Sequence, residues 1–125
     1  HPASIEEELK LVPYIANVMV YGSGKPYNVA IIFPDFDFVQ KYAKDNGISF
    51  DSNKDLVNNE QIKELLIEEA TKQLKGNFGG YEIPKKWMLI DKDFTLENGM
   101  LTQTMKLKRR NVLKEYGDQL NGLYA

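Results

Sequence analysis

The sequence predicts an α+β fold in which a small, mainly antiparallel sheet is flanked by helices. Helix-type and strand-type segments alternate in the order α-β-β-α-α-β-(β)-α, which has too few strands for a wound parallel sheet. Two of the strand-type segments are neighbours, separated by a short turn that contains glycine, which is typical of a β-hairpin. With 125 residues and 42% hydrophobic residues, the chain suits a single domain over 1–125.

The N-terminal part contains a predicted helix followed by the hairpin. We expect the helix at residues 5–11, because Ser4 and Glu7 have the spacing of a capping box at its start. Residues 15–21 and 27–33 are rich in β-branched and aromatic side chains, so we expect them to be the two hairpin strands. One or two further strands, later in the chain, would complete the sheet.

Two helices are predicted in the middle of the chain. Asp35 can cap the first of them, and Gly47 ends it. Residues 48–59 are mainly polar, so we interpret them as a loop. Asn58 is the predicted cap of the second helix, and Gly76 ends it. The apolar residues of this second helix form one stripe: Ile62, Leu65, Leu66, Ala70 and Leu74.

The C-terminal part combines short extended pieces with a last helix. Residues 77–84 are predicted to be an irregular connector, and residues 87–90 a third strand with Trp87 as a core anchor. Residues 94–96 are a candidate for a further short strand. The last helix follows the basic stretch and carries one apolar face: Val112, Leu113, Tyr116 and Leu120.

Composition and charge exclude several kinds of function. The net charge of −2 argues against a nucleic-acid partner. With no cysteine and His1 as the one imidazole, neither a metal site nor a Ser-His-Asp triad is predicted. The lack of cysteine suits a reducing compartment, so we expect a cytoplasmic location. The acidic groups at 6–8 and 91–93 are expected to be solvated.

The basic stretch at 98–110 is the candidate functional element. It begins as a turn and ends as the start of a helix that carries Lys106, Lys108, Arg109 and Arg110. Taken alone, it is typical of a solvated basic helix start. Four cations at a helix N-terminus oppose the helix dipole, which favours an anionic ligand nearby.

Three motifs occur in a defined order along the chain. They are Ile-Glu at 5–6, Tyr-Glu-Ile-Pro at 81–84, and Leu-Thr-x-Thr-x-Lys-x-Lys-Arg-Arg at 101–110. By these motifs and their spacing, the chain resembles the C-terminal domain of AMP-forming acyl-CoA synthetases, within the adenylate-forming ligase superfamily. The long-chain fatty acid branch is the most similar, and the resemblance covers essentially the whole chain.

The resemblance implies a catalytic lysine in the last motif. Aligning the arginine pair at 109–110 places the family's lysine at Lys106. Two residues depart from the family pattern: Met105 stands where the commonest form has glycine, and Gln103 where the long-chain branch often has proline. Lys108 therefore remains a second candidate. Arg109 and Arg110 are expected to pair with acidic residues or to contact coenzyme A phosphates.

The resemblance also implies partners that this chain does not contain. The family reaction uses ATP, Mg²⁺, coenzyme A and a carboxylic acid, with magnesium bound to ATP phosphates in a large N-terminal adenylation domain. The C-terminal domain moves relative to that domain, so we expect this segment alone to be inactive. The resemblance leaves open a peripheral membrane contact in the parent enzyme.

Two other functions stay open from the sequence. The chain could be a stand-alone α+β module that is regulatory or binds phosphate or nucleic acid through its basic stretch. It could also belong to a related ligase whose thiol acceptor is the phosphopantetheine of a carrier protein instead of free coenzyme A.

Overall fold

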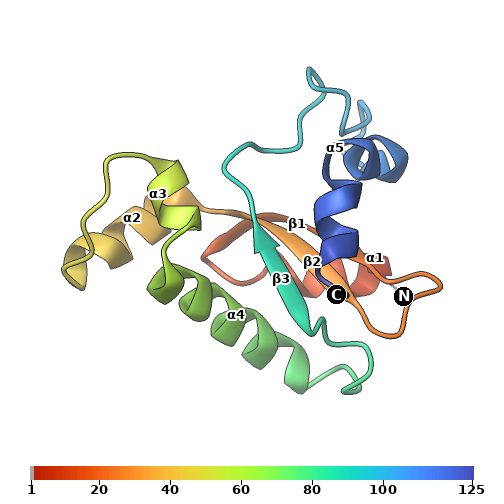
Figure 1. The fold of residues 1–125 in the computed structure, drawn as a ribbon, viewed down its shortest axis with the longest axis horizontal. Helices are drawn as coiled ribbons and strands as arrows, with labels where there is room; N and C mark the ends of the chain where they lie inside the picture. The colour runs from red at the N-terminus through yellow and green to blue at the C-terminus, as the bar shows by residue number, and fades with distance from the viewer. Residues whose placement is uncertain (1) are drawn as a thin grey trace.

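The computed structural model describes residues 2–125 and has a three-stranded sheet with helices packed on it (Figure 1). The elements, in chain order, are α1 (Pro2–Leu9), β1 (Ile15–Tyr21), β2 (Val29–Pro34), α2 (Phe36–Asp45), α3 (Asn53–Val57), α4 (Glu60–Lys75), β3 (Lys86–Leu89) and α5 (Arg109–Gly122). The predicted α+β class is confirmed. Among residues 2–125, no helix is both long and apolar enough to cross a membrane.

The central strand of the sheet is β2, with β1 and β3 as its edges. β1 and β2 form the predicted antiparallel hairpin, in which Val20 lies opposite Ala30. β3 pairs with β2 in parallel, with Trp87 opposite Ala30, so the sheet is mixed but mainly antiparallel. Trp87 is buried in the core, as predicted.

Alternation along the strands separates two apolar cores. Val18 and Val20 of β1, with Ala30 and Ile32 of β2, belong to the first core, which contains residues of α1, α2, α3 and α4. The intervening residues of the strands belong to the second core, which the segment after β3 and helix α5 cover. The second core contains these buried residues: Met19, Val29, Ile31, Ile90, Phe94, Met100, Leu101, Val112 and Leu120.

Each helix of the middle region begins at a side-chain cap. Asp35 caps α2, accepting hydrogen bonds from the amides of residues 37 and 38. Gly47 follows α2 with φ +70°, the left-handed conformation predicted for it. Asn59 caps α4 by accepting from Ile62 N at 3.0 Å. Such caps contribute about 1 kcal/mol each, because they satisfy amides that the helix leaves unpaired.

Two predictions in the middle region are wrong. Residues 48–59 are not all loop, since α3 forms there with a capping box between Ser52 and Asp55. Its formation makes Asn58 the C-terminal cap of α3, so the N-cap of α4 is one residue later than predicted. Burial of Leu56 in the first core explains why so short a helix is stable.

The N-terminal helix and the strands also differ from prediction at their ends. α1 starts at Pro2, which suits a first turn because it needs no amide partner, so Ser4 lies inside the helix and does not cap it. β2 starts at Val29, because Asn28 pairs with the connector through Lys85 N and Glu82 O. β3 begins and ends one residue before the predicted 87–90. Residues 94–96 form no strand.

Candidate active-site loop

The loop before α5 starts at an Asn-Gly turn. Asn98 Oδ1 accepts hydrogen bonds from Thr95 N at 3.0 Å and from Met100 N at 3.1 Å. Its Nδ2 donates to Asp93 O at 2.8 Å. Gly99 has φ +78°, so the turn needs a residue that tolerates the left-handed region. The turn lets Met100 and Leu101 enter the second core and thereby anchors the loop.

Lys106 lies at the closing end of a tighter turn. Thr102 N donates to Lys106 O at 2.8 Å, and Lys106 N donates to Thr102 Oγ1 at 3.1 Å. Outside these bonds, Leu101 and Leu107 form an isolated antiparallel bridge. The backbone of Lys106 is therefore held on both sides, while its side chain is exposed. An exposed side chain on a fixed backbone is a suitable carrier for a charge that must reach a ligand.

Met105 has an unusual backbone conformation. Its φ is +66°, and among residues 2–125 it is the one residue other than glycine with positive φ. This conformation costs an ordinary L-residue about 1–2 kcal/mol. Met105 is 69% exposed, so the packing of its side chain offsets little of that cost. The closed Thr102–Lys106 turn imposes the conformation.

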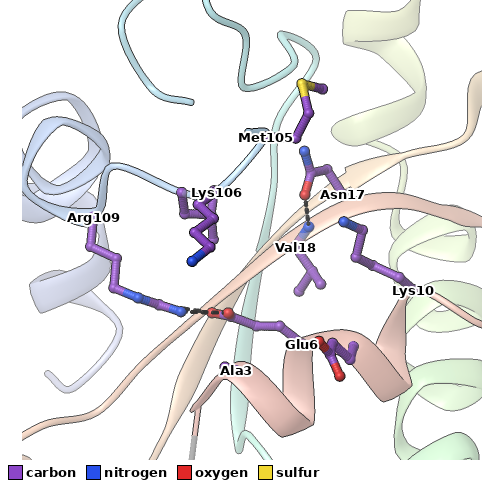
Figure 2. Close-up of a pocket in the computed structure, with 10 residues that line it drawn as sticks. Ala3, Glu6, Lys10, Asn17, Val18, Met105, Lys106 and Arg109 are labelled. Atoms are coloured by element: carbon purple, nitrogen blue, oxygen red, sulfur yellow. Dashed lines mark hydrogen bonds and ion pairs between the residues drawn. The ribbon is translucent and has the colours of Figure 1, made fainter. Parts of the chain in front are cut away.

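The loop faces α1 and β1 across an open cleft of about 430 Å³ (Figure 2). The loop contributes Met105 and Lys106, and Arg109 contributes from the start of α5. The residues on the opposite side are Ala3, Glu6, Glu7, Lys10, Asn17 and Val18. Figure 2 shows the Lys106 side chain pointing into this cleft, whereas Met105 lies at its rim.

The structure separates the four predicted basic residues. Lys106 and Arg109 line the cleft, whereas Lys108 and Arg110 are exposed outside it. Within residues 2–125, the Lys106 ammonium makes neither an ion pair nor a hydrogen bond. Lys108 takes the N-cap position of α5 without a side-chain cap. The geometry therefore distinguishes the two lysine candidates, and of the two it is Lys106 that faces the cleft.

Arg109 forms a two-pronged ion pair with Glu6. Its Nη1 donates to Glu6 Oε2 at 2.8 Å, and its Nη2 donates to Glu6 Oε1 at 2.5 Å. These hydrogen bonds raise the pKa of the Arg109 guanidinium above its ordinary value, although partial burial opposes the shift. Of the two roles predicted for Arg109, pairing with an acidic residue is the one that the structure contains.

The prediction that the acidic group at residues 6–8 is solvated is wrong for Glu6. Glu6 is only 6% exposed, and its Oε2 also accepts from Val20 N at 2.7 Å. Glu8 is half-buried and accepts from Gln73 Nε2 at 2.6 Å. Only Glu7 of this group is exposed, as predicted. The sequence offers one signal for Glu6, since it lies next to Ile5 on the buried side of an amphipathic helix.

The described residues offer no ready metal site. Among residues 2–125, no three carboxylate, imidazole or thiolate side chains are grouped as metal ligands would be. Asp93 instead accepts hydrogen bonds from Asn17 Nδ2 and from Phe94 N, and Asp91 is exposed. The cleft is lined by the cationic side chains of Lys10, Lys106 and Arg109 and by the carboxylates of Glu6 and Glu7.

The same fold occurs in adenylate-forming enzymes. The A-PCP didomain of a carboxylic acid reductase from Segniliparus rugosus, solved in complex with AMP, superposes with a TM-score of 0.80 and 25% identity. The match covers 99% of this chain and 16% of that one. The adenylation domain of the carboxylate reductase from Mycobacterium chelonae gives a TM-score of 0.79 and 26% identity over 98% of this chain and 17% of that one. Fold and loop together define a C-terminal domain of adenylate-forming enzymes.

Sequence relatives lead to the same class. Long chain acyl-CoA synthetase 4 of Arabidopsis thaliana is 32% identical over 97% of the chain, and long-chain-fatty-acid–CoA ligase 5 of Mus musculus is 30% identical over 98%. The match spans 18% of the length of each relative. The chain belongs to the AMP-binding enzyme C-terminal domain family, which it matches over residues 1–125. The resemblance found in the sequence motifs is thereby confirmed.

Proposed function

We propose that this chain is the mobile C-terminal domain of an ATP-dependent, AMP-forming acyl-CoA ligase, and that Lys106 is its catalytic lysine. The substrate we propose is a carboxylic acid, specifically a long-chain fatty acid, because relatives at 30% and 32% identity carry that activity in their names. The observation that carries the proposal is the Lys106 ammonium, which faces the cleft unpaired within residues 2–125 on a backbone fixed by Thr102.

The chemistry of the first half-reaction explains why such a lysine is needed. A carboxylate must approach the α-phosphate of ATP, and the two anions repel each other. An ammonium group between them offsets that repulsion and stabilises the charge that develops as the bond forms. A preorganised cation of this kind is worth about 3–4 kcal/mol, or roughly 100- to 1,000-fold in rate. The fixed backbone of Lys106 provides the preorganisation.

The rest of the site would lie in a large N-terminal adenylation domain. ATP supplies the adenylyl group, and Mg²⁺ would bind its phosphates there, since the described residues contain no cluster of metal ligands. Coenzyme A thiol then has to reach the adenylate, which requires Lys106 to be withdrawn. A rigid-body rotation of this domain achieves that, because the loop and α5 are anchored on one core. We propose a cytoplasmic enzyme in which this domain alone is inactive.

The decisive experiment replaces Lys106 in the full-length parent enzyme. Lys106→Ala should lower acyl-adenylate formation roughly 100- to 1,000-fold, while thioester formation from supplied acyl-adenylate stays near the wild-type rate. Lys108→Ala is the matched control, because Lys108 lies two residues away, is exposed and does not line the cleft. Near-normal adenylation in Lys106→Ala, with loss in Lys108→Ala, would refute the assignment. Pyrophosphate release and single-turnover thioester assays separate the two half-reactions.

One of the solved structures supports an alternative thiol acceptor for the second half-reaction. The Segniliparus rugosus neighbour is an A-PCP didomain, so a carrier-bound phosphopantetheine thiol is the alternative to free coenzyme A. Both acceptors use the same first half-reaction, and Lys106 keeps its role in either. Supplying the parent enzyme with ATP and acid, then with coenzyme A or a phosphopantetheinylated carrier, identifies the acceptor by which thioester forms.

A further inference from the structure

Glu6 is the one charged residue among residues 2–125 that is buried. A buried carboxylate is costly unless it is paired and hydrogen-bonded. Glu6 meets both conditions through Val20 N and the guanidinium of Arg109. Because β1 is an edge strand, the outward amide and carbonyl of Val20 need partners beyond the sheet. Glu6 accepts from the amide, and Arg109 Nη1 donates to Val20 O at 3.4 Å.

The ion pair and the candidate catalytic lysine share one cleft. Glu6, Lys106 and Arg109 all line it, and Figure 2 shows the Lys106 amine directed toward the Glu6–Arg109 pair. Glu6 is therefore an anion within the space that Lys106 reaches. The planar Arg109 fork engages both carboxylate oxygens at once, which a point-charge ammonium cannot do. Arg109 thus has the geometric advantage for Glu6 and leaves Lys106 unpaired.

We propose that Arg109 is a positioning residue that occupies the Glu6 carboxylate and so keeps the Lys106 ammonium free for a substrate anion. This inference rests on the proposed function of Lys106. Glu6 has a structural role because it accepts from Val20 N at the edge of β1, and Arg109 prevents that carboxylate from pairing with the functional lysine. Without Arg109, Glu6 would be buried and unpaired, and Lys10 and Lys106 would be the cations left in the same cleft. Of these two, Figure 2 shows the Lys106 amine directed toward Glu6 and the Lys10 amine directed toward Asn17.

The test compares single and double substitutions in the full-length enzyme. Arg109→Gln leaves the Glu6 charge in place, so adenylation should fall on the order of 10- to 100-fold as Lys106 is drawn away from its working position. Thioester formation from supplied acyl-adenylate should stay within about twofold. Glu6→Gln/Arg109→Gln removes the competing charge as well, and adenylation should recover to within a few-fold of wild type. Arg109→Lys should lie between Arg109→Gln and wild type, because it keeps the charge without the fork.

The double variant distinguishes this role from simple anchoring of α5. If Arg109 only fixed the helix, Glu6→Gln/Arg109→Gln would be at least as impaired as Arg109→Gln, and that result would overturn the inference. Unchanged adenylation in Arg109→Gln would overturn it too. The double variant contains no uncompensated buried charge, so it decides the question even where Arg109→Gln alone unfolds. Circular dichroism of each variant establishes which ones are folded.

Two controls separate failure of this inference from failure of the proposed function. Lys106→Ala gives the adenylation rate that remains without the proposed catalytic lysine. Retained adenylation in that variant would refute the proposed function itself. Lys41→Gln/Asp45→Asn removes an exposed ion pair on α2, far from the cleft, and should leave both half-reactions at the wild-type rate. If Lys106→Ala is inactive and Arg109→Gln is fully active, the function stands and the positioning role is wrong.

Discussion

The two faces of the sheet are covered in different ways. Four helices contribute to the first core, and α2, α3 and α4 each begin at a side-chain cap. The second core is covered by α5, which has no side-chain cap, and by the irregular segment from Ile90 to Lys108 (Figure 1). The candidate catalytic lysine lies on this second side.

This difference teaches where stability and function are located in so small a domain. On the first side, helix caps and apolar packing reinforce each other, and none of the described residues other than glycine there has positive φ. On the second side, the side-chain oxygens of Asn98 and Thr102 accept backbone hydrogen bonds that shape the loop. The same loop holds Met105 in the unfavourable left-handed conformation. Strain of this kind persists where the surrounding structure holds it, and it is common at functional sites.

The largest expected effect is loss of packing on the helical side. Leu66 is fully buried in the first core, so Leu66→Ala should lower the free energy of unfolding by about 2–5 kcal/mol. Leu65→Ala is the matched control, because Leu65 is the next residue on the same helix and is only half-buried. This substitution should lower the free energy of unfolding by less. Chemical denaturation followed by circular dichroism measures both. An equal or larger cost for Leu65→Ala would mean that the helical side is packed differently.

The same contrast explains how far the sequence predicted the fold. The predicted helix stripe at 62–74 is correct except for Leu65, because 3.6-residue periodicity reports directly on which side chains face a core. The hairpin was predicted from another local signal, two runs of β-branched and aromatic residues separated by a short turn that contains glycine. Helix α3 was missed because its one fully buried residue, Leu56, gives no periodicity, although the Ser52–Asp55 capping box was present as a signal. The parallel pairing of β3 depends on contacts far apart in sequence, which no local pattern reports.

The candidate site was predictable in part. The motif at 101–110 identified the basic residues, but it did not say which of them faces a cleft. The contribution of Glu6 was missed, because an acidic run at 6–8 is usually solvated and its partner is Arg109, on the last helix. The role of Thr102 was missed as well, since a hydroxyl that accepts from an amide four residues later has no signature in composition. Long-range pairs and loop closure both require coordinates.

A smaller effect is expected at the C-terminal end of the loop-covered side. Tyr124 Oη donates to Tyr21 O at 3.2 Å and to Tyr27 O at 2.9 Å, which ties the chain end to the hairpin. Burial, with smaller contributions from Tyr21 and Tyr27, raises the pKa of Tyr124 above its ordinary value. Tyr124→Phe should lower the free energy of unfolding by about 0.5–1.5 kcal/mol at neutral pH.

The pH dependence provides the control for Tyr124. A tyrosine whose pKa is raised by folding contributes stability that is present below its unfolded pKa of about 10 and is lost as pH rises beyond it. Stability of the wild type should therefore fall above about pH 10, and Tyr124→Phe should fall less steeply. Some slope should remain, because burial also raises the pKa of Tyr116. Identical slopes in the two proteins would show that Tyr124 is solvated in solution.

The smallest expected change, and the one with opposite sign, concerns Met105. Glycine adopts positive φ without the penalty of about 1–2 kcal/mol, although it costs about 0.4–1 kcal/mol through the unfolded chain. Met105→Gly should therefore raise the free energy of unfolding by about 0.5–1 kcal/mol. Gln103→Gly is the matched control, since Gln103 is exposed in the same turn without positive φ and should be destabilised instead.

The outcome also bears on which lysine reaches the substrate. The commonest form of the family motif has glycine directly before its catalytic lysine, and position 105 has the backbone conformation that glycine suits best. A stabilised Met105→Gly variant that keeps its adenylation activity would support Lys106 as the matching lysine. If Met105→Gly loses as much stability as Gln103→Gly, the left-handed turn does not exist in solution. The structure would then no longer distinguish Lys106 from Lys108 as the catalytic lysine. The contrast between the fixed loop and the helical side would also be weaker.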